Sequence, residues 1–217
     1  MIMKKKAFTI SLTGNPVINM NVIPGHFTTS HFHLSHYLDL FDLKSNAAIA
    51  RNVAVELAVP YIHSTPVDTI VCMEGTEIIG AYLAEELRQS GRSVINSERE
   101  IHVVSPIYSV DKKLIFHSNV QEKIKNKNVL LLVSSISSGA TIKSALECLS
   151  YYCGIVVGKS ALFNAYPDQF KKEIHSLFTN KDIPNYQMYR PDECHLCSNG
   201  YPLDALIISD GYTKMNQ

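Results

Sequence analysis

The sequence has no excess charge of either sign, no long apolar run and an odd number of cysteines. Lysine plus arginine and aspartate plus glutamate both number 20 in 217 residues, a balance that argues against a broad electrostatic contact with nucleic acid. No segment reaches the roughly 20 apolar residues that a membrane-spanning helix needs, so we expect no membrane partner. Gly14, Asn15 and Pro16 interrupt the apolar stretch that an export signal would need after the basic start. The interrupted apolar stretch predicts a cytoplasmic protein. The odd number of cysteines, five, in a chain without an export signal argues against a disulfide framework.

Short apolar runs alternate along the chain with longer segments of helical periodicity. The sequence contains no internal repeat and no low-complexity linker. A hydrophobic content of 46% in 217 residues suits one α/β domain with a modest extra element. We expect the residues before Asn46 to be irregular. Apolar periodicity predicts helices at Asn46–Ala58, Glu77–Gln89 and Ala140–Leu149. Short apolar runs predict strands at Val67–Cys72, Ser93–Ile95, Ile101–Val104, Val129–Val133 and Gly154–Gly158. Two further apolar segments are Ser160–Ala165 and Ile174–Phe178, and Pro202–Ser209 is apolar enough to be a strand or a helix that docks on the core.

Two of the predicted strands run directly into short polar turns that open predicted helices. Met73-Glu-Gly-Thr76 follows the strand that ends at Cys72, and Ser137-Ser-Gly-Ala-Thr141 follows the strand that begins at Val129. Alternating strands and helices predict a mostly parallel sheet flanked by helices, whose strands end at one common edge. Because the first N–H groups of a helix favour an anion, two anion pockets would face one crevice. Alternatively, these are ordinary strand-to-helix turns with a serine or threonine cap.

The order of elements around the second turn resembles the type I phosphoribosyltransferases, particularly the orotate phosphoribosyltransferase branch. The motif of that family has four apolar residues, two acids, four mostly small or apolar residues, and then Gly-x-Thr. Here Val133 and Ser134 stand in the two acidic positions, and Gly139-Ala-Thr141 matches the end of the motif. The resemblance implies one domain over residues 1–217, with a parallel-sheet core at about residues 45–180 and a small hood from residues 1–44 and 181–217.

The resemblance also implies a reaction, the transfer of ribose 5-phosphate between phosphoribosyl pyrophosphate and a ring nitrogen of a base. Orotate is the first base to try, Mg²⁺ would arrive with the pyrophosphate, and a homodimer is expected. Ser134 would bind a sugar hydroxyl. The pyrophosphate would lie on the first turn, at Met73, Glu74, Gly75 and Thr76, and the 5-phosphate on the second, at Ser137, Ser138, Gly139, Ala140 and Thr141.

Three cations are candidates for a catalytic role around a long connection from Ser105 to Val120, which we expect to be an irregular, mobile loop. Arg99, Lys112 and Lys113 would neutralise the departing pyrophosphate if this loop closed over it as a lid. Alternatively, they are exposed side chains that keep a surface loop in water.

The neutral Val133–Ser134 pair leaves other functions open, because the family's acids bind the ribose hydroxyls and help to place magnesium. Losing two charged hydrogen-bond partners, each worth roughly 1.5–3 kcal/mol, would weaken ribose binding by about two to four powers of ten. The chain could therefore be a regulator that binds phosphoribosyl pyrophosphate or a nucleotide without efficient catalysis. It could also act on a different phosphorylated sugar.

Histidines and cysteines occur in two groups near the ends of the chain. His31 and His33 are spaced so that an extended segment would place them on one side, with His36 nearby. No cysteine or carboxylate beside them completes a recognisable zinc set. Cys194-His-Leu-Cys197 has the spacing of half a zinc knuckle. The plainer interpretation is two reduced cysteines that pack a carboxyl-terminal segment, and we assign no metal site from the sequence.

Overall fold

The computed structural model describes residues 6–89, 95–170, 174–208 and 211–215, and the chain divides into two compact units. Lys44–Thr179 form the first, which we call the core unit. Met1–Leu43 and Asn180–Gln217 form the second, which we call the terminal unit. Each unit has its own sheet, and the two sheets are described separately below.

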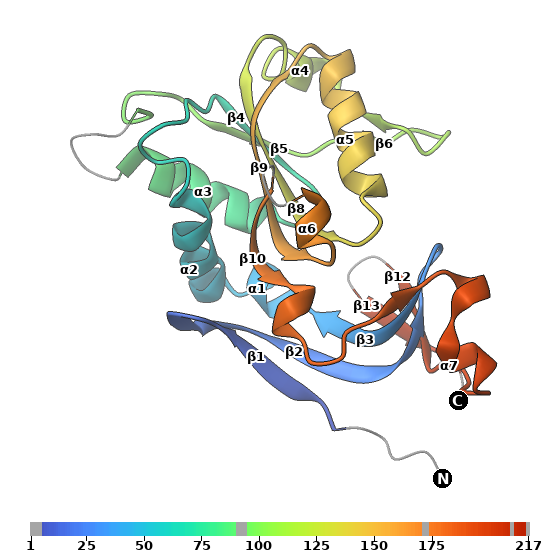
Figure 1. Ribbon diagram of the computed structural model, residues 1–217. Coiled ribbons are helices and arrows are strands. Elements are labelled where there is room, and N and C mark those ends of the chain that lie inside the picture. The colour runs from blue at the N-terminus through green and yellow to red at the C-terminus, as the bar shows by residue number, and fades with distance from the viewer. Residues whose placement is uncertain (1–5, 90–94, 171–173, 209–210, 216–217) are drawn as a thin grey trace. The chain divides into compact units, whose positions relative to one another are not determined.

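The core unit is built on a five-stranded sheet in which all neighbouring strands are parallel (Figure 1). The expected α/β fold with a central parallel sheet is thereby confirmed. The central strand β8 is wholly buried at Val129–Val133, as a continuous aliphatic run requires. In spatial order the strands are β10 (His175–Thr179), β9 (Ile155–Asn164), β8 (Asn128–Ile136), β4 (Thr69–Cys72) and β5 (His102–Val104).

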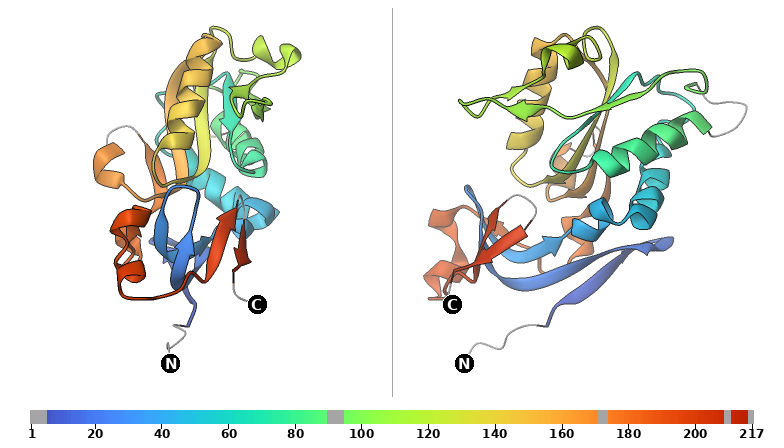
Figure 2. Two further views of the ribbon diagram at one scale, coloured as in Figure 1. Left: turned by 90° about the vertical axis from the view of Figure 1, so that its right-hand side faces the viewer. Right: turned by 180° about the vertical axis from the view of Figure 1, so that it is seen from behind.

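Helices cover both faces of this sheet. Helices α2 (Ala47–Ala58) and α3 (Glu77–Gln89) lie on one face and α5 (Ala140–Tyr151) lies on the other (Figures 1 and 2). Asn46 caps α2, because its side-chain oxygen accepts a hydrogen bond from the N–H of Ala48 at 3.1 Å. Gly80 lets α3 approach β4 closely, since a Cβ there would lie 2.3 Å from the sulfur of Cys72. Both predicted strand–turn–helix units are therefore present.

Several boundaries in the core unit differ from those predicted. Strand β8 continues to Ile136, beyond its predicted end at Val133, and the second turn follows directly from Ser137, as predicted. Strand β9 joins two segments that were predicted separately. Gly158 lies within the strand and does not end it; glycine is needed there because a Cβ would lie 2.5 Å from the ring of Tyr61. In the predicted strand Ser93–Ile95, only Ile95 lies inside the described residues, and it is in a turn.

The expectation of an irregular connection from Ser105 to Val120 is wrong. Strand β6 (Ile107–Tyr108) pairs antiparallel with β7 (Leu114–Ile115), and the short helix α4 (Ser118–Gln121) follows. The hairpin is anchored by burial, because Leu114 and Phe116 join the apolar cluster that also contains Cys148 and Leu149 of α5. Its polar tip hides this alternation of apolar residues in the sequence.

The expectation that the chain is irregular before Asn46 is also wrong. Strands β1 (Phe8–Leu12), β2 (Asn15–Thr28) and β3 (His33–Asp39) form consecutive antiparallel pairs. Strand β2 has the period of two that a strand with one buried face requires, since Ile18, Met20 and Val22 are buried. Its asparagines and prolines resemble turn signals, but Pro24 lies at a break in register, where a strand tolerates it.

The carboxyl-terminal residues complete the sheet of the terminal unit. Strand β12 (Ala205–Ile208) pairs parallel with β2 and antiparallel with β13 (Gly211–Lys214), and β11 (Met188–Tyr189) pairs with β3. The apolar segment predicted from Pro202 is thus a strand. The remaining short elements are α1 (Phe41–Ser45), α6 (Pro167–Phe170), η1 (Asn180–Asp182), η2 (Pro191–Glu193) and α7 (His195–Ser198). Among the described residues, no helix is both long and apolar enough to cross a membrane.

Candidate active site

The two predicted turns lie side by side at the carboxyl edge of the core sheet. Their strands, β4 and β8, are neighbours, with Cys72 opposite Leu132. The first turn is also fixed to the second strand, because the N–H of Met73 donates to the carbonyl of Leu132 at 2.9 Å. The hydroxyl of Thr76, which is fully buried, donates to the carbonyl of Met73 at 2.9 Å. The sheet therefore holds both turns in a defined relation, as the parallel topology predicts.

The backbone of the first turn is sharply bent. Glu74 and Gly75 have φ values of 58° and 77°, and the left-handed region is costly for a residue with a side chain such as Glu74. Lys44 supports this conformation, because its ammonium group donates to the carbonyl of Glu74 at 2.8 Å. Lys44 is buried and belongs to the core unit. It is a cation at the first turn that the sequence analysis missed, since no pattern links it to a turn 30 residues away.

The carboxyl group of Glu74 connects the first turn to the second. It accepts a hydrogen bond from the N–H of Ser135 at 3.3 Å, and the N–H of Ser134 and the hydroxyl of Thr141 also hydrogen-bond to it. Glu74 is exposed as a residue, but the atoms packed around its carboxyl partly desolvate it and raise its pKa, while these donors and the positive charge of Lys44 act in the opposite direction. A carboxylate therefore lies at the end of β8, although the strand itself supplies no acid there.

The second turn has the geometry of a helix start that exposes backbone donors. Gly139 precedes α5 with φ 78° and ψ 1°, a left-handed conformation that glycine adopts without strain. The hydroxyl of Ser138 accepts the N–H of Ala140 at 3.2 Å, so one of the first amides is satisfied by the chain itself. This bond is a local serine turn and not a helix cap, because the N-cap residue is Gly139 and, among the described residues, no side chain caps α5 there. Ser138 and Ala140 are exposed, so the turn remains accessible from solvent.

The two residues in the acidic positions of the family motif face the interior of the core unit. Val133 is 1% exposed and belongs to the apolar cluster that also contains Leu131 and Ala145. Ser134 is buried as well. Its N–H, rather than its hydroxyl, makes the contact with Glu74.

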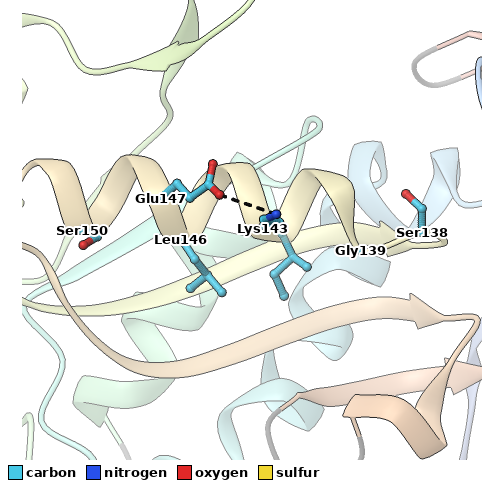
Figure 3. Close-up of a pocket in the computed structure, with 7 residues that line it drawn as sticks. Ser138, Gly139, Lys143, Leu146, Glu147 and Ser150 are labelled. Atoms are coloured by element: carbon cyan, nitrogen blue, oxygen red, sulfur yellow. Dashed lines mark ion pairs between the residues drawn. The ribbon is translucent and has the colours of Figure 1, made fainter.

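A shallow hollow of about 640 Å³ reaches the second turn along the flank of α5 (Figure 3). Ser138 and Gly139 form its end at the turn, and Ile142 and Leu146 form part of its wall. The remaining lining residues are Lys143, Glu147 and Ser150, and an ion pair of 3.9 Å joins the first two of them. The hollow adds an apolar surface beside the second turn, and no residue of the first turn lines it.

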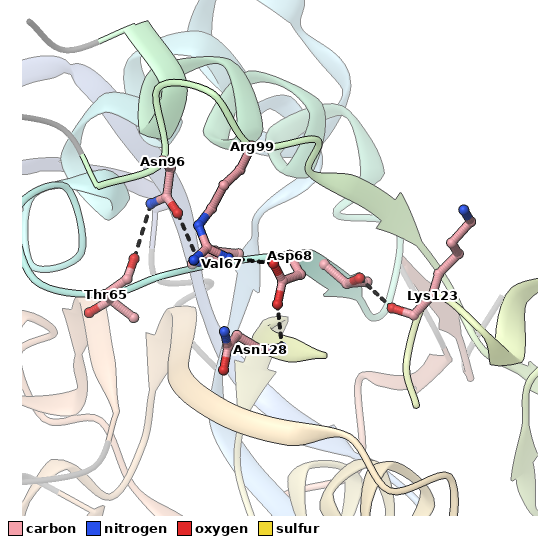
Figure 4. Close-up of polar contacts among 8 residues, drawn as sticks. Thr65, Val67, Asp68, Asn96, Arg99, Lys123 and Asn128 are labelled. Carbon is pink, nitrogen blue, oxygen red and sulfur yellow. Dashed lines mark hydrogen bonds and ion pairs between the residues drawn. The ribbon is translucent and has the colours of Figure 1, made fainter. Parts of the chain in front are cut away.

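Figure 4 shows the side chain of Arg99 directed at Asp68, with Asn128 on the other side of that carboxylate. Its guanidinium group donates to Asp68 at 2.6 Å, and the other carboxylate oxygen of Asp68 accepts the N–H of Asn128 at 2.9 Å. Asp68 precedes β4 and Asn128 begins β8, so this network joins the amino ends of the strands. The structure therefore places Arg99 at the edge of the sheet opposite the two turns, although its sequence position beside the predicted loop suggested otherwise. Its assignment as a catalytic cation stays a prediction.

Lys112 and Lys113 lie at the tip of the β6–β7 hairpin. Lys112 has φ 58°, and its N–H donates to the carbonyl of Ser109 at 2.9 Å, which closes a tight turn. Both lysines are exposed. Within the described part of the chain, no hydrogen bond or ion pair joins either lysine to the two turns. Their assignment as catalytic cations stays a prediction.

The parallel sheet with two turns at its carboxyl edge is the type I phosphoribosyltransferase fold. Over 74% of this chain and 34% of the other, the UMP synthase of Leishmania donovani superposes with a TM-score of 0.52 at 18% identity, a likeness that shows the fold alone. No family model matches the chain. Two curated proteins named orotate phosphoribosyltransferase are each 25% identical to it. The protein of a Thermoanaerobacter species aligns over 181 residues, 82% of this chain and 86% of its own, and that of Caldicellulosiruptor saccharolyticus over 192 residues, 84% and 87%. The resemblance stated from the sequence is thereby confirmed.

Proposed function

We propose that the chain is a phosphoribosyltransferase that transfers ribose 5-phosphate between phosphoribosyl pyrophosphate and a ring nitrogen of a base, with orotate the first candidate. The observation that carries the proposal is the pair of turns, Met73–Thr76 and Ser137–Thr141, on neighbouring strands at one edge of a parallel sheet. Such an edge with two groups of backbone donors suits a substrate that carries phosphate at both ends. The similarity to two orotate phosphoribosyltransferases over four-fifths of the chain supports the same reaction.

In this proposal Glu74 supplies the negative charge that Val133 and Ser134 lack. Its carboxylate lies at the backbone of Ser135, beside the turn that would hold the 5-phosphate. As the base nitrogen attacks the anomeric carbon, the bond from that carbon to the pyrophosphate oxygen breaks and positive charge develops on the ribose. A carboxylate placed there stabilises that charge and accepts hydrogen bonds from the ribose hydroxyls. The hydroxyl of Thr141 hydrogen-bonds to Glu74 in the structure. A 5-phosphate bound at Thr141 would compete for this hydroxyl, and the Glu74 carboxylate would then turn toward the sugar.

The pyrophosphate would lie on the first turn, where Lys44 supplies positive charge. Magnesium carried by the pyrophosphate would neutralise part of the charge on the leaving group, and the oxygen of Glu74 is a ligand of the kind that this ion prefers. The uncapped amides at the start of α5 would hold the 5-phosphate. Ser134 contributes its N–H to the position of Glu74, and its buried hydroxyl is the proposed neutral partner of the sugar.

The proposal is tested by calorimetry with phosphoribosyl pyrophosphate and Mg²⁺, followed by an assay of pyrophosphate release with orotate and other common bases. Binding together with turnover is the expected result. Binding without turnover of any base would instead support a regulator that keeps the ligand site, an outcome that the neutral, buried Val133 and Ser134 would explain. Absence of binding would overturn both functions.

Replacing Lys44 with methionine is expected to weaken the binding of phosphoribosyl pyrophosphate by roughly 10- to 100-fold, because hydrogen bonds to charged groups contribute about 1.5–3 kcal/mol. Methionine fills the space of the buried lysine stem, so the fold should persist. The loss of positive charge should also raise the pKa of Glu74 further, since Lys44 acts to lower it. Calorimetry measures the first effect, and the pH dependence of turnover measures the second. Lys125→Met, at an exposed lysine that precedes the amino end of β8, is the matched control, and equal affinities of the two variants would contradict the assignment.

A further inference from the structure

Four side chains that bind metals in other proteins converge inside the terminal unit. His26 lies on β2 and His33 begins β3. Cys194 immediately precedes α7, and Cys197 lies within that helix. One ligand atom from each of the four lies within 4.8 Å of the others. His26, His33 and Cys194 are buried, and only Cys197 is exposed. The phosphoribosyltransferase proposal uses none of these residues.

The sheet explains why the two histidines meet. Strands β2 and β3 are antiparallel, and Thr28 lies opposite His33. Because side chains on one face of a strand recur every second residue, His26 shares a face with Thr28 and is a diagonal neighbour of His33. The sequence analysis paired His33 with His31 instead. His31 precedes β3 and is exposed, so it takes no part in this group.

The distances between the ligand atoms are those of a tetrahedral metal site. With metal bonds of about 2.3 Å to sulfur and 2.05 Å to nitrogen, the edges of a tetrahedron are roughly 3.3 Å between nitrogens and 3.6 Å between nitrogen and sulfur. The Nε2 atom of His26 is 3.3 Å from the Nδ1 atom of His33. The sulfur of Cys194 is 3.5 Å from Nε2 of His26, and the sulfur of Cys197 is 3.7 Å from the same atom and 3.3 Å from Nδ1 of His33.

The second nitrogen of His26 is held as it is in metal-binding histidines. Its Nδ1 atom lies 2.9 Å from the carbonyl of Tyr201 and 3.2 Å from that of Pro202, so Nδ1 carries the proton and donates it. The lone pair of Nε2 then points into the cluster. In metal sites a backbone carbonyl commonly accepts the N–H of a ligand histidine in this way and so fixes which nitrogen faces the metal.

We propose that His26, His33, Cys194 and Cys197 bind one zinc ion as a closed structural site. Two thiolates and two imidazoles in a tetrahedron are the donor set that zinc prefers. Four protein ligands leave no open position for a substrate, so the site stabilises the fold and does not catalyse.

The position of the site shows what it would stabilise. It joins the β2–β3 hairpin to the residues that lead into β12, where the N–H of His26 donates to the carboxylate of Asp204 at 2.8 Å. One apolar cluster in this region has only four buried members, Phe27, Leu34, Tyr37 and Ala205. A small core of this kind commonly needs a disulfide or a metal to be stable.

The test measures the metal content of the full chain after expression with zinc. About one zinc ion per chain is expected for the wild type, and Cys197→Ser should bind zinc roughly 100-fold more weakly or worse, because even second-shell changes cost 10- to 100-fold. Cys153→Ser is the matched control, since Cys153 is also exposed but lies in the core unit. Cobalt substitution should give the thiolate charge-transfer band and the intense visible bands of a tetrahedral site in the wild type and the control.

Cys197→His distinguishes loss of a ligand from loss of the fold. The exposed position accepts an imidazole, so this variant should regain zinc and shift the cobalt spectrum. A wild-type chain that binds no zinc or cobalt would overturn the proposal, as would a disulfide between Cys194 and Cys197 in the chain purified without reductant. So would zinc content that is equal in the wild type and Cys197→Ser. None of these results would affect the binding of phosphoribosyl pyrophosphate by the core unit.

Discussion

Val133→Asp is expected to destabilise the core unit by about 3–5 kcal/mol, the cost of a buried charge without a partner. The side chain of Val133 is 1% exposed and packs in the apolar cluster of β8 and α5. A carboxyl group there must either lose its water or force the strand and the helix apart. Urea unfolding followed by circular dichroism measures the change, and partial unfolding at room temperature is within the expected range.

Val133→Ala separates the effect of charge from the effect of lost packing. It removes two methyl groups and leaves a small cavity, so it should cost less than the aspartate variant. Equal stability of the two variants would mean that the side chain at position 133 reaches water, and our placement of it in the core would be wrong. The expected result has a functional consequence. An acid cannot simply be restored at the first position of the family motif, so any charge must come from another part of the chain.

The parts of the fold that could be predicted are those encoded by local pattern. The aliphatic run of β8, the Asn46 cap of α2 and the glycine that opens α5 all determine their conformation within a few residues. For that reason the parallel sheet of the core unit, the helices α2, α3 and α5 and both turns were predicted in outline. Strand β2 was missed because its apolar period of two is combined with proline and asparagine, which usually indicate turns.

The side chains of the site could not be placed in the same way, because distant pairings bring them together. Glu74 meets Ser135 across 61 positions, and Cys194 meets His26 across 168. Arg99 shows the converse, since its partner Asp68 places it at the amino ends of the strands and not at the edge that its sequence position suggested. Glu74, His33, Cys194 and Cys197 were candidates from the sequence, whereas Lys44 and His26 were not, because the partners of a side chain depend on strand register and on the path of the chain between strands.

Glu74→Gln is expected to lower kcat by roughly 10- to 100-fold, because a hydrogen bond to a charged group contributes about 1.5–3 kcal/mol. Glutamine keeps the shape of the side chain and can still accept the N–H of Ser135, but it cannot carry the negative charge that the transition state requires. Pyrophosphate release under saturating substrate measures the effect. Glu77→Gln, in the first turn of α3, is the control, since its carboxylate binds the hydroxyl of Ser105 and does not contact the second turn. A Glu74→Gln variant with the kcat of the control would remove Glu74 from the mechanism.

The pH dependence gives an independent test, because partial desolvation of the carboxyl raises the pKa of Glu74 above its ordinary value of 4.5. Turnover that needs the ionised carboxylate should rise with pH through that elevated pKa, and this limb should be absent in Glu74→Gln.

Stability should change in the opposite sense. A carboxyl whose pKa is higher in the folded than in the unfolded chain contributes most below the unfolded value, and its contribution is lost as pH rises through the folded value. At neutral pH the glutamine variant should therefore be at least as stable as the wild type. Thermal unfolding of the wild type and of Glu74→Gln, measured from below the unfolded pKa of the carboxyl to neutral pH, checks the direction of this change in stability. A fall in activity without a fall in stability would then show that the carboxylate acts in the reaction and not in holding the two turns together.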